Sequence, residues 1–353
     1  MNIFVHMGSA LMLAAIPASS WGAPAAPVQS YDEYRSWLVA CDNGLSCIAK
    51  GFDDGSSRAE LTIEREAGPN GAATATIATE SAFTARDLAI DGKPLALDMS
   101  AWTLTTEDGD GSTLTTDDPA AIRALVARLR VGAMLSAGGA EIPLDGITAA
   151  LLRMDDRQGR VGGVTALIRP GPRPAGDVPA PPAIPRIARR PIAARLSAGE
   201  ADRLIARVRT EQAALFEKEG CQEMPGAMTA EANALNDMQA IVFVPCIMGA
   251  YQGSSLAFIV PRGKGASRQL ILPTPYLGAD AESANLSYFT EAWFDAEGGT
   301  ISTAAKGRGL ADCGTSASWI WDGAAFRLTS LDLQRNCGGR YPGDWPSLFR
   351  SVQ

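Results

Sequence analysis

The spacing of apolar and polar residues changes along the chain and separates expected strands from expected helices. The stretch SWLVACDNGLSCIAKGF places apolar residues on both sides of the turn-forming Asp42-Asn43-Gly44. Further on, AELTIERE and TATIATE alternate with a period of two and are separated by the turn-rich AGPNGA. These patterns predict two strands joined by a tight turn, followed by a β-hairpin.

The sequence DDPAAIRALVARLRVG is the clearest helix pattern of the chain. Asp117 or Asp118 can cap the helix, Pro119 suits its first turn, and Gly132 can end it. One face would carry Ile122, Leu125, Val126 and Leu129. A short strand and a second helix, capped near Asp145, are expected in AEIPLDGITAALLRMDDRQGR, and a last strand in VGGVTALIRP.

Residues 169–195 contain eight prolines, which exclude a helix or a central strand. We interpret this segment as a semi-rigid linker between two bodies, residues 31–168 and 196–353; a basic docking segment is the alternative. The second body begins with a helix pattern, in which Ser197 and Glu200 form a capping box and Leu196 a hydrophobic staple. Short apolar runs broken by Gly, Pro and Asp then predict a β-meander. The expected fold is α+β, with two β-rich antiparallel-sheet bodies that each carry one or two helices.

The N-terminal residues 1–25 read as a signal peptide, because a short apolar run precedes an A-x-A cleavage pattern at Ala23 and Ala25. The usual basic region is missing, since the first positive charge is Arg35; a buried N-terminal segment is the alternative. We therefore expect a periplasmic or secreted protein without a transmembrane segment in its mature chain.

Six cysteines fit an oxidising compartment. They allow 15 pairings, of which pairing between sequence neighbours would give Cys41–Cys47, Cys221–Cys246 and Cys313–Cys337. Metal binding is less favoured, because no C-x-x-C motif or zinc-ribbon spacing is present. We expect no metal and no cofactor.

The single histidine is His6, inside the expected leader. Without it, a mature chain has no Ser-His-Asp or Cys-His catalysis, no His-ligated zinc and no His proton shuttle. The net charge of −8 also argues against a surface that follows nucleic-acid phosphates. An enzyme would have to use carboxylates, Lys, Tyr, Ser-Lys pairs or a hard cation.

Aromatic residues near the C-terminus are candidates for binding. Trp319 and Trp321 lie two residues apart, hence on one face of an expected strand, and Asp322-Gly323 predicts the hairpin turn. We interpret the tryptophans as core, with a sugar-stacking platform as the alternative. In NCGGRYPGDW, Arg340 and Tyr341 lie beside an expected disulfide in a Gly-Pro loop that could enter a cleft.

The segments SWLVACDNGLSC, GRGLADCGTSASWIWDGAAFRL and GDWPSLFRS, together with the six cysteines and the leader, resemble an uncharacterised family of secreted bacterial proteins, domain of unknown function 1176. The resemblance covers nearly the whole mature chain and carries over no catalytic residue. The first body also resembles invasion-associated locus B proteins, in its Trp-x-x-x-Cys opening and in IPLDGITAAL. That likeness implies a periplasmic β-rich module linked to envelope or host interaction.

Three functions remain open. The first is a non-enzymatic binding module whose partner is an envelope protein or a glycan. The second is a hydrolase of cell-wall glycan that uses two carboxylates, with Glu291 and Asp295, or Asp312, as candidates. The third is an inhibitor of host lysozyme or protease that acts through Arg340 and Tyr341. No catalytic residue is assigned.

Overall fold

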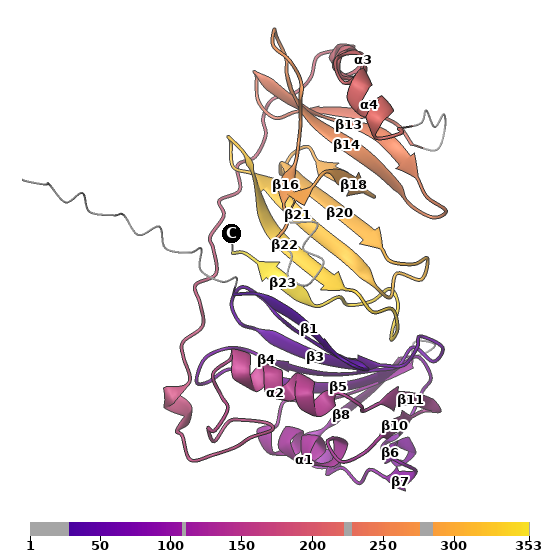
Figure 1. Cartoon of the computed structure of the whole chain (residues 1–353), viewed down its shortest axis with the longest axis vertical. Coiled ribbons are helices and arrows are strands. Elements are labelled where there is room, and N and C mark those ends of the chain that lie inside the picture. Colours follow the sequence, from indigo (N-terminus) through magenta and orange to yellow (C-terminus); the bar gives the residue numbers. More distant parts are fainter. Residues whose placement is uncertain (1–27, 108–110, 222–227, 276–284, 353) are drawn as a thin grey trace, which may run out of the picture.

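The computed structural model describes residues 28–107, 111–221, 228–275 and 285–352. The expected leader at 1–25, with His6 and its cleavage site, lies outside the described residues. Antiparallel sheets and four α-helices make up the regular structure of the described chain (Figure 1). None of its described helices has the length and apolar character needed to cross a membrane.

Residues 28–168 form a seven-stranded antiparallel sheet, here called the N-terminal sheet, with the order β1-β2-β3-β4-β5-β9-β8. Its strands are β1 (Ser30–Tyr34), β2 (Trp37–Cys41), β3 (Cys47–Phe52), β4 (Glu60–Arg65), β5 (Ala73–Thr79), β8 (Thr103–Glu107) and β9 (Gly111–Thr116). A smaller sheet joins β11 (Ala140–Pro143), β10 (Met134–Ala137), β6 (Ala89–Ile90) and β7 (Lys93–Pro94). Two 3₁₀ turns complete this part of the chain: η1 (Ala85–Asp87) lies between β5 and β6 in sequence, and η2 (Met99–Ala101) lies between β7 and β8. The predicted turn between β2 and β3 and the β4–β5 hairpin are confirmed.

Helices α1 (Pro119–Leu129) and α2 (Ile147–Arg157) cover one face of the N-terminal sheet. The prediction for α1 is confirmed: Asp118 accepts hydrogen bonds from two amides of the first turn, and all four residues of the predicted face are buried. The predicted cap of α2 near Asp145 is confirmed in position, because the N-cap residue is Gly146, in a left-handed conformation. No side chain caps this helix, and Asp145 pairs with Arg35. The predicted strand in 161–170 is wrong. The backbone there forms turns, and the buried carboxylate of Asp155 accepts the amides of Leu167 and Ile168.

The C-terminal residues form two main antiparallel sheets. The first contains β12 (Glu231–Ala234), β13 (Gln239–Met248), β14 (Gly253–Pro261), β15 (Arg268–Gln269) and β18 (Tyr288–Thr290). The second is the predicted meander of β19 (Trp293–Asp295), β20 (Thr300–Lys306), β21 (Gly314–Trp321), β22 (Phe326–Gln334) and β23 (Ser347–Arg350). A short pair, β16 (Leu272–Pro273) and β17 (Asn285–Leu286), lies between them in sequence.

The predicted long helix after residue 196 is two consecutive helices, α3 (Glu200–Glu211) and α4 (Ala213–Lys218). Only half of the predicted capping box forms. The Glu200 carboxylate accepts the backbone amide of Ser197 at 2.9 Å, whereas Gly199 occupies the N-cap position and provides no side chain. Leu204 and Val208 of α3 bury their side chains against β13 and β14.

The proline-rich residues 169–195, which include η3 (Ala175–Asp177), run along one side of the molecule (Figure 1). The segment is in contact with the folded chain over much of its length. Arg173 donates to the carbonyl oxygens of Gly159 and Val161, and Ile192 is buried among C-terminal strands. It therefore packs as a strap rather than as a free tether.

The face of the N-terminal sheet that α1 and α2 leave open packs on the C-terminal meander (Figure 1). Tyr31, Leu38 and Ala40 share one buried cluster with residues of β22 and β23. Asn43 exchanges two hydrogen bonds with the backbone of Arg350, at 3.0 and 2.9 Å. Residues on either side of the strap thus contribute to one hydrophobic core.

Three disulfides join sequence neighbours: Cys41–Cys47, Cys221–Cys246 and Cys313–Cys337. The first closes the turn between β2 and β3, and the second ties the end of α4 to β13. The pairing between neighbours that the spacing suggested is confirmed.

Candidate functional site

A hollow of about 430 Å³ lies where the β13–β14 hairpin meets the chain between β18 and β19. We call it the hairpin hollow. Its lining comes from three separate stretches, residues 228–231, 243–255 and 291–294. The described lining residues are Met228, Thr229, Glu231, Phe243, Met248, Tyr251, Gln252, Gly253, Ser255, Glu291, Ala292 and Phe294.

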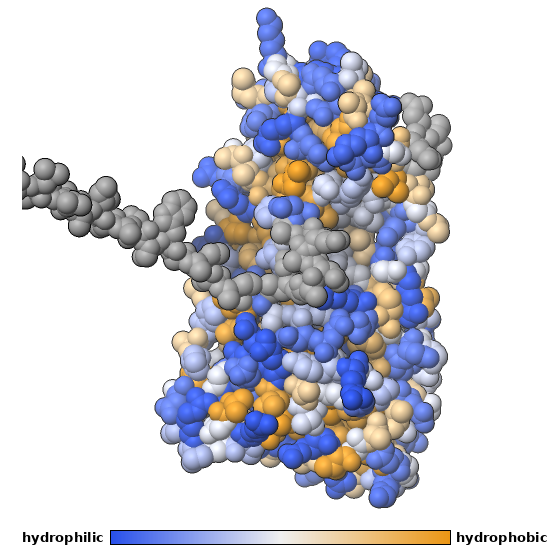
Figure 2. Space-filling model, viewed as in Figure 1, coloured by the Kyte–Doolittle hydropathy of each residue, from blue (hydrophilic) through white to orange (hydrophobic). Residues whose placement is uncertain are grey.

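The rim of the hairpin hollow exposes large apolar side chains. Hydrophobic residues on the face drawn in Figure 2 mostly form small groups among hydrophilic ones. Around the hairpin tip, in contrast, the lining residues Met248 and Tyr251 are 42% and 46% exposed, and Ile247, which is outside the lining, is 44% exposed. A β-bulge between Pro245 and Ile247 precedes them, and bulges redirect the side chains that follow. Such a concentration of exposed apolar surface is typical of an interaction site.

The hairpin tip is held in place by polar contacts. The Gln252 amide donates to the carbonyl oxygen of Lys306 at 3.1 Å and accepts the Lys306 amide at 2.9 Å. The Tyr251 hydroxyl contacts the carbonyl oxygen of Gly307 at 3.3 Å. The polar ends of both side chains are therefore anchored, and the Tyr251 ring presents an apolar surface that needs no further ordering to bind.

The wall of the hollow contains Glu291, whose backbone has a positive φ of 47°. A side chain is strained in this conformation, and such strain gathers at ligand clamps and active sites. Two contacts with Gly253 maintain it: the Glu291 amide donates to the Gly253 carbonyl oxygen at 2.9 Å, and the Glu291 carboxylate accepts the Gly253 amide at 2.8 Å. The carboxylate is thereby held in place in the lining of the hollow.

The lining of the hollow combines apolar side chains with negatively charged ones. Phe243 and Phe294 form its aromatic floor, with ring centroids 6.5 Å apart. Glu231 and Glu291 add two carboxylates, and the described lining contains no Lys or Arg. A ligand with apolar groups and a positive charge complements such a surface.

The other carboxylates proposed from the sequence have structural partners. Asp295 accepts the Glu297 amide at 3.0 Å and faces Arg189 at 3.4 Å; hydrogen bonds from the amides of Gly298 and Glu297 lower its pKa. It is not among the lining residues of the hollow. Of the pair proposed for hydrolysis, only Glu291 lines this hollow.

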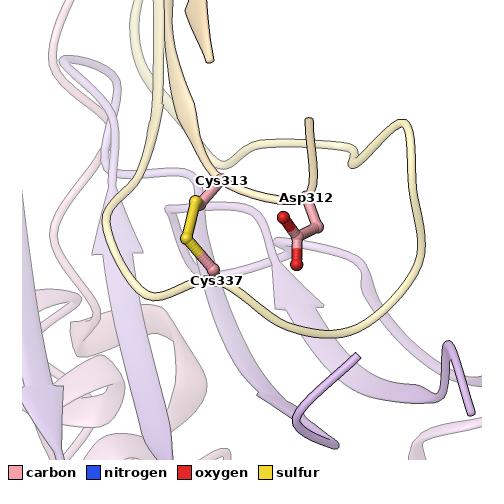
Figure 3. Close-up of side chains that lie close together, drawn as sticks. All are labelled: Asp312, Cys313 and Cys337. Carbon is pink, nitrogen blue, oxygen red and sulfur yellow. A yellow bond between two sulfur atoms is a disulfide. The ribbon is translucent and has the colours of Figure 1, made fainter. Parts of the chain in front are cut away.

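Asp312 is buried beside the Cys313–Cys337 disulfide (Figure 3). Its carboxylate accepts the Arg308 Nε at 2.8 Å and the terminal nitrogen of the same guanidinium. The two sulfur atoms are bonded to each other, and a metal binds the thiolate form of cysteine. This group is therefore part of the scaffold.

The proposed binding residues lie elsewhere. Trp319 and Trp321 are 0% and 3% exposed and belong to the core, as their core interpretation predicted. Arg340 and Tyr341 are half-buried in the loop that packs on the N-terminal sheet. There, the Arg58 guanidinium carbon lies 3.5 Å from the centroid of the Tyr341 ring, and the Arg340 amide points to Glu60. Of these four residues, none lines the hairpin hollow.

Sequence reasoning missed Met228, Glu231, Met248 and Tyr251. One local signal was present: large apolar residues inside the glycine-flanked turn of IMGAYQG, where polar residues are usual. The proximity of this turn to Glu291 follows from the tertiary fold and has no local signature.

Comparison with known proteins gives the following matches. The family model described as "Protein of unknown function (DUF1176)" matches residues 31–351. The chain is 33% identical over 343 residues to the uncharacterized protein YpfG of Escherichia coli (strain K12), covering 93% of this chain and 94% of the relative. No solved structure matches significantly. The resemblance of residues 31–168 to invasion-associated locus B proteins stays a prediction.

Proposed function

Because this chain belongs to the DUF1176 family, whose description assigns no activity, we propose a function from the site itself: an exported, non-enzymatic binding module of the cell envelope. The observation that carries the proposal is the hairpin hollow, with exposed apolar residues at its rim and two carboxylates in its lining. The three disulfides support export to an oxidising compartment. Residues 31–168 and 196–353 would act as two bodies. The hydrophobic core that they share would hold the strap and the hairpin hollow in fixed positions relative to each other.

The ligand that fits this surface best is a protein segment with apolar and basic side chains. Methionine adapts its shape to different partners, and Met228 and Met248 both line the hollow. The carboxylates of Glu231 and Glu291 would select a basic residue beside the apolar ones.

A cross-linking pull-down from the envelope extract of the host tests this proposal. The bait is the oxidised chain without residues 1–25, and the site variant is Met248→Asp, which places a charge on the apolar rim. The matched control is Met238→Asp, because Met238 is 72% exposed and is not part of the hollow. We expect one protein partner to be retained by wild type and M238D and lost by M248D. Equal recovery with both variants would contradict binding at this hollow.

A wall-directed hydrolase is the second candidate, because Glu231 and Glu291 line the same hollow and two carboxylates can cleave a glycoside without histidine. Clearing of a purified peptidoglycan suspension by wild type but not by Glu291→Gln would favour this function. Absence of clearing by the wild type would remove it for wall substrates.

A further inference from the structure

A second hollow, of about 440 Å³, lies where the strap crosses the turn between β21 and β22. We call it the strap hollow. It is lined by Pro185, Arg186, Ile187, Ala188, Arg190, Asp322 and Arg327. Three arginines and one aspartate thus line this hollow, in a chain whose net charge is −8. A local excess of positive charge on an acidic protein indicates a site for an anion.

The backbone that carries these arginines is fixed on both sides. The Ile187 amide donates to the Val352 carbonyl oxygen at 2.9 Å, and the Val352 amide donates to Pro185 at 3.0 Å. Further along, the Ile192 amide donates to Glu297 at 3.0 Å, and the Ile192 side chain is buried. The strap therefore displays its arginines from an ordered backbone, which lowers the entropy lost on binding.

Arg190 is the least engaged of the three arginines. Its aliphatic stem crosses Gly323, where an added Cβ would lie 3.2 Å from the Arg190 Cδ. Gly323 has a φ of 100°, which favours glycine and keeps this path open. Among the described residues, no hydrogen bond or ion pair engages the Arg190 guanidinium, while its neighbour Arg189 pairs with Asp295.

Asp322 is the one carboxylate in the lining, and its oxygens are engaged by Arg327 and by the surrounding turn. Oδ1 accepts the amides of Ala324 and Ala325 at 2.9 and 2.8 Å, and Oδ2 accepts the Arg327 Nε at 2.7 Å. The hydrogen bond from Arg327 and those from the two amides lower the pKa of Asp322 to about 2. The carboxylate therefore offsets the charge of Arg327, and among the described residues no carboxylate pairs with Arg190.

We propose that the strap hollow binds a phosphate group, with Arg190 as the principal donor and Arg186 and Arg327 beside it. A guanidinium donates two parallel hydrogen bonds to phosphate oxygens, and a phosphate can accept from more than one arginine. Free phosphate compounds and phospholipid headgroups share this chemistry. The site is separate from the hairpin hollow and does not depend on the function proposed there.

Two binding measurements on the oxidised chain distinguish a free phosphate compound from a phospholipid headgroup as the source of the phosphate group. Calorimetric titration with inorganic phosphate tests a soluble ligand, and co-sedimentation with phosphatidylglycerol vesicles, against phosphatidylcholine vesicles, tests a headgroup. The site variant is Arg190→Gln, and the matched control is Arg123→Gln, an exposed arginine on α1. We expect binding in at least one measurement, about tenfold weaker in R190Q and unchanged in R123Q.

The outcome assigns the source of the phosphate. Binding of inorganic phosphate indicates a soluble ligand, and binding only to phosphatidylglycerol indicates a headgroup; both support the site if R190Q weakens them and R123Q does not. Arg190→Lys, which keeps the charge and loses the planar donor pair, should bind with intermediate affinity. No binding in either measurement, or equal loss in R190Q and R123Q, would overturn the proposal.

Discussion

The ammonium group of Lys50 lies 2.9 Å from a carboxylate oxygen of Glu60, and the Lys50 side chain is 1% exposed. Lys50 also donates to the Asp344 carbonyl oxygen at 3.2 Å. The pair therefore lies beneath the loop between β22 and β23, which packs on the N-terminal sheet. A buried charge remains ionised at acceptable cost only while its partner is present.

Replacing Lys50 by methionine should destabilise the fold, because the nearly buried Glu60 would lose its cationic partner. We expect Lys50→Met to lower the free energy of unfolding by about 3 kcal/mol, measured by urea denaturation. Lys93→Met, at an exposed lysine, is the control and should change little. The double variant K50M/E60Q should recover part of the loss; a K50M protein as stable as K93M would contradict this account of the interface.

The Cys221–Cys246 disulfide closes a loop with a sequence separation of 25. By loop entropy, its removal in the double variant Cys221→Ala/Cys246→Ala should cost about 3 kcal/mol. Urea denaturation of the variant and the oxidised wild type measures the difference. A loss below about 1 kcal/mol would show that the unfolded chain gains little freedom without this bond.

Stability should depend on pH through Glu200. Hydrogen bonds from Arg262 and Ser197 lower the pKa of Glu200 from its ordinary 4.5 to about 2. Glu200 therefore binds a proton more readily in the unfolded state than in the folded state. Its ionised carboxylate stabilises the fold above about pH 5, and this stabilisation is lost as the pH falls toward 2. Glu200→Gln should unfold with a shallower dependence on pH between 5 and 2. Identical slopes for variant and wild type would contradict the assignment to Glu200.

Gly253→Ala should disturb the hairpin hollow, because an added Cβ would come within 2.2 Å of the Met228 sulfur. The sulfur lies near the end of a flexible side chain, so Met228 can move and the fold should persist. We expect the far-UV circular dichroism spectrum to stay unchanged while partner recovery falls. The same substitution at Gly176, where nothing lies within 4 Å, is the control and should leave recovery intact.

Local patterns predicted the local structures of this chain. Asp118, Pro119 and the apolar face of α1 are close in sequence, and the spacing of the cysteines was enough to suggest the disulfides. The start of α2 near Asp145 was predicted as well, whereas the pairing of Asp145 with Arg35, which is 110 residues away, was not. Such contacts between distant residues are decided by the tertiary fold.

The candidate site was only partly predictable. Glu291 was singled out from its apolar surroundings in TEAWFDAEGG, but the hollow also requires the β13–β14 hairpin tip and Met228. The same holds for the strap: its prolines predicted an extended chain, whereas its contact with Val352 at the C-terminus depends on packing. Pairings between distant segments leave no periodic signal in a single sequence.

The most direct test of the central claim is photo-cross-linking from the hairpin hollow. A photoreactive phenylalanine analogue replaces Tyr251 in one protein and Val164, which is 52% exposed and outside the hollow, in another. Both oxidised proteins are irradiated in envelope extract, and the adducts are identified by mass spectrometry. We predict one cross-linked protein segment that contains apolar and basic residues, formed from position 251 and absent from position 164. Glycan adducts alone, or the same adducts from both positions, would contradict the account.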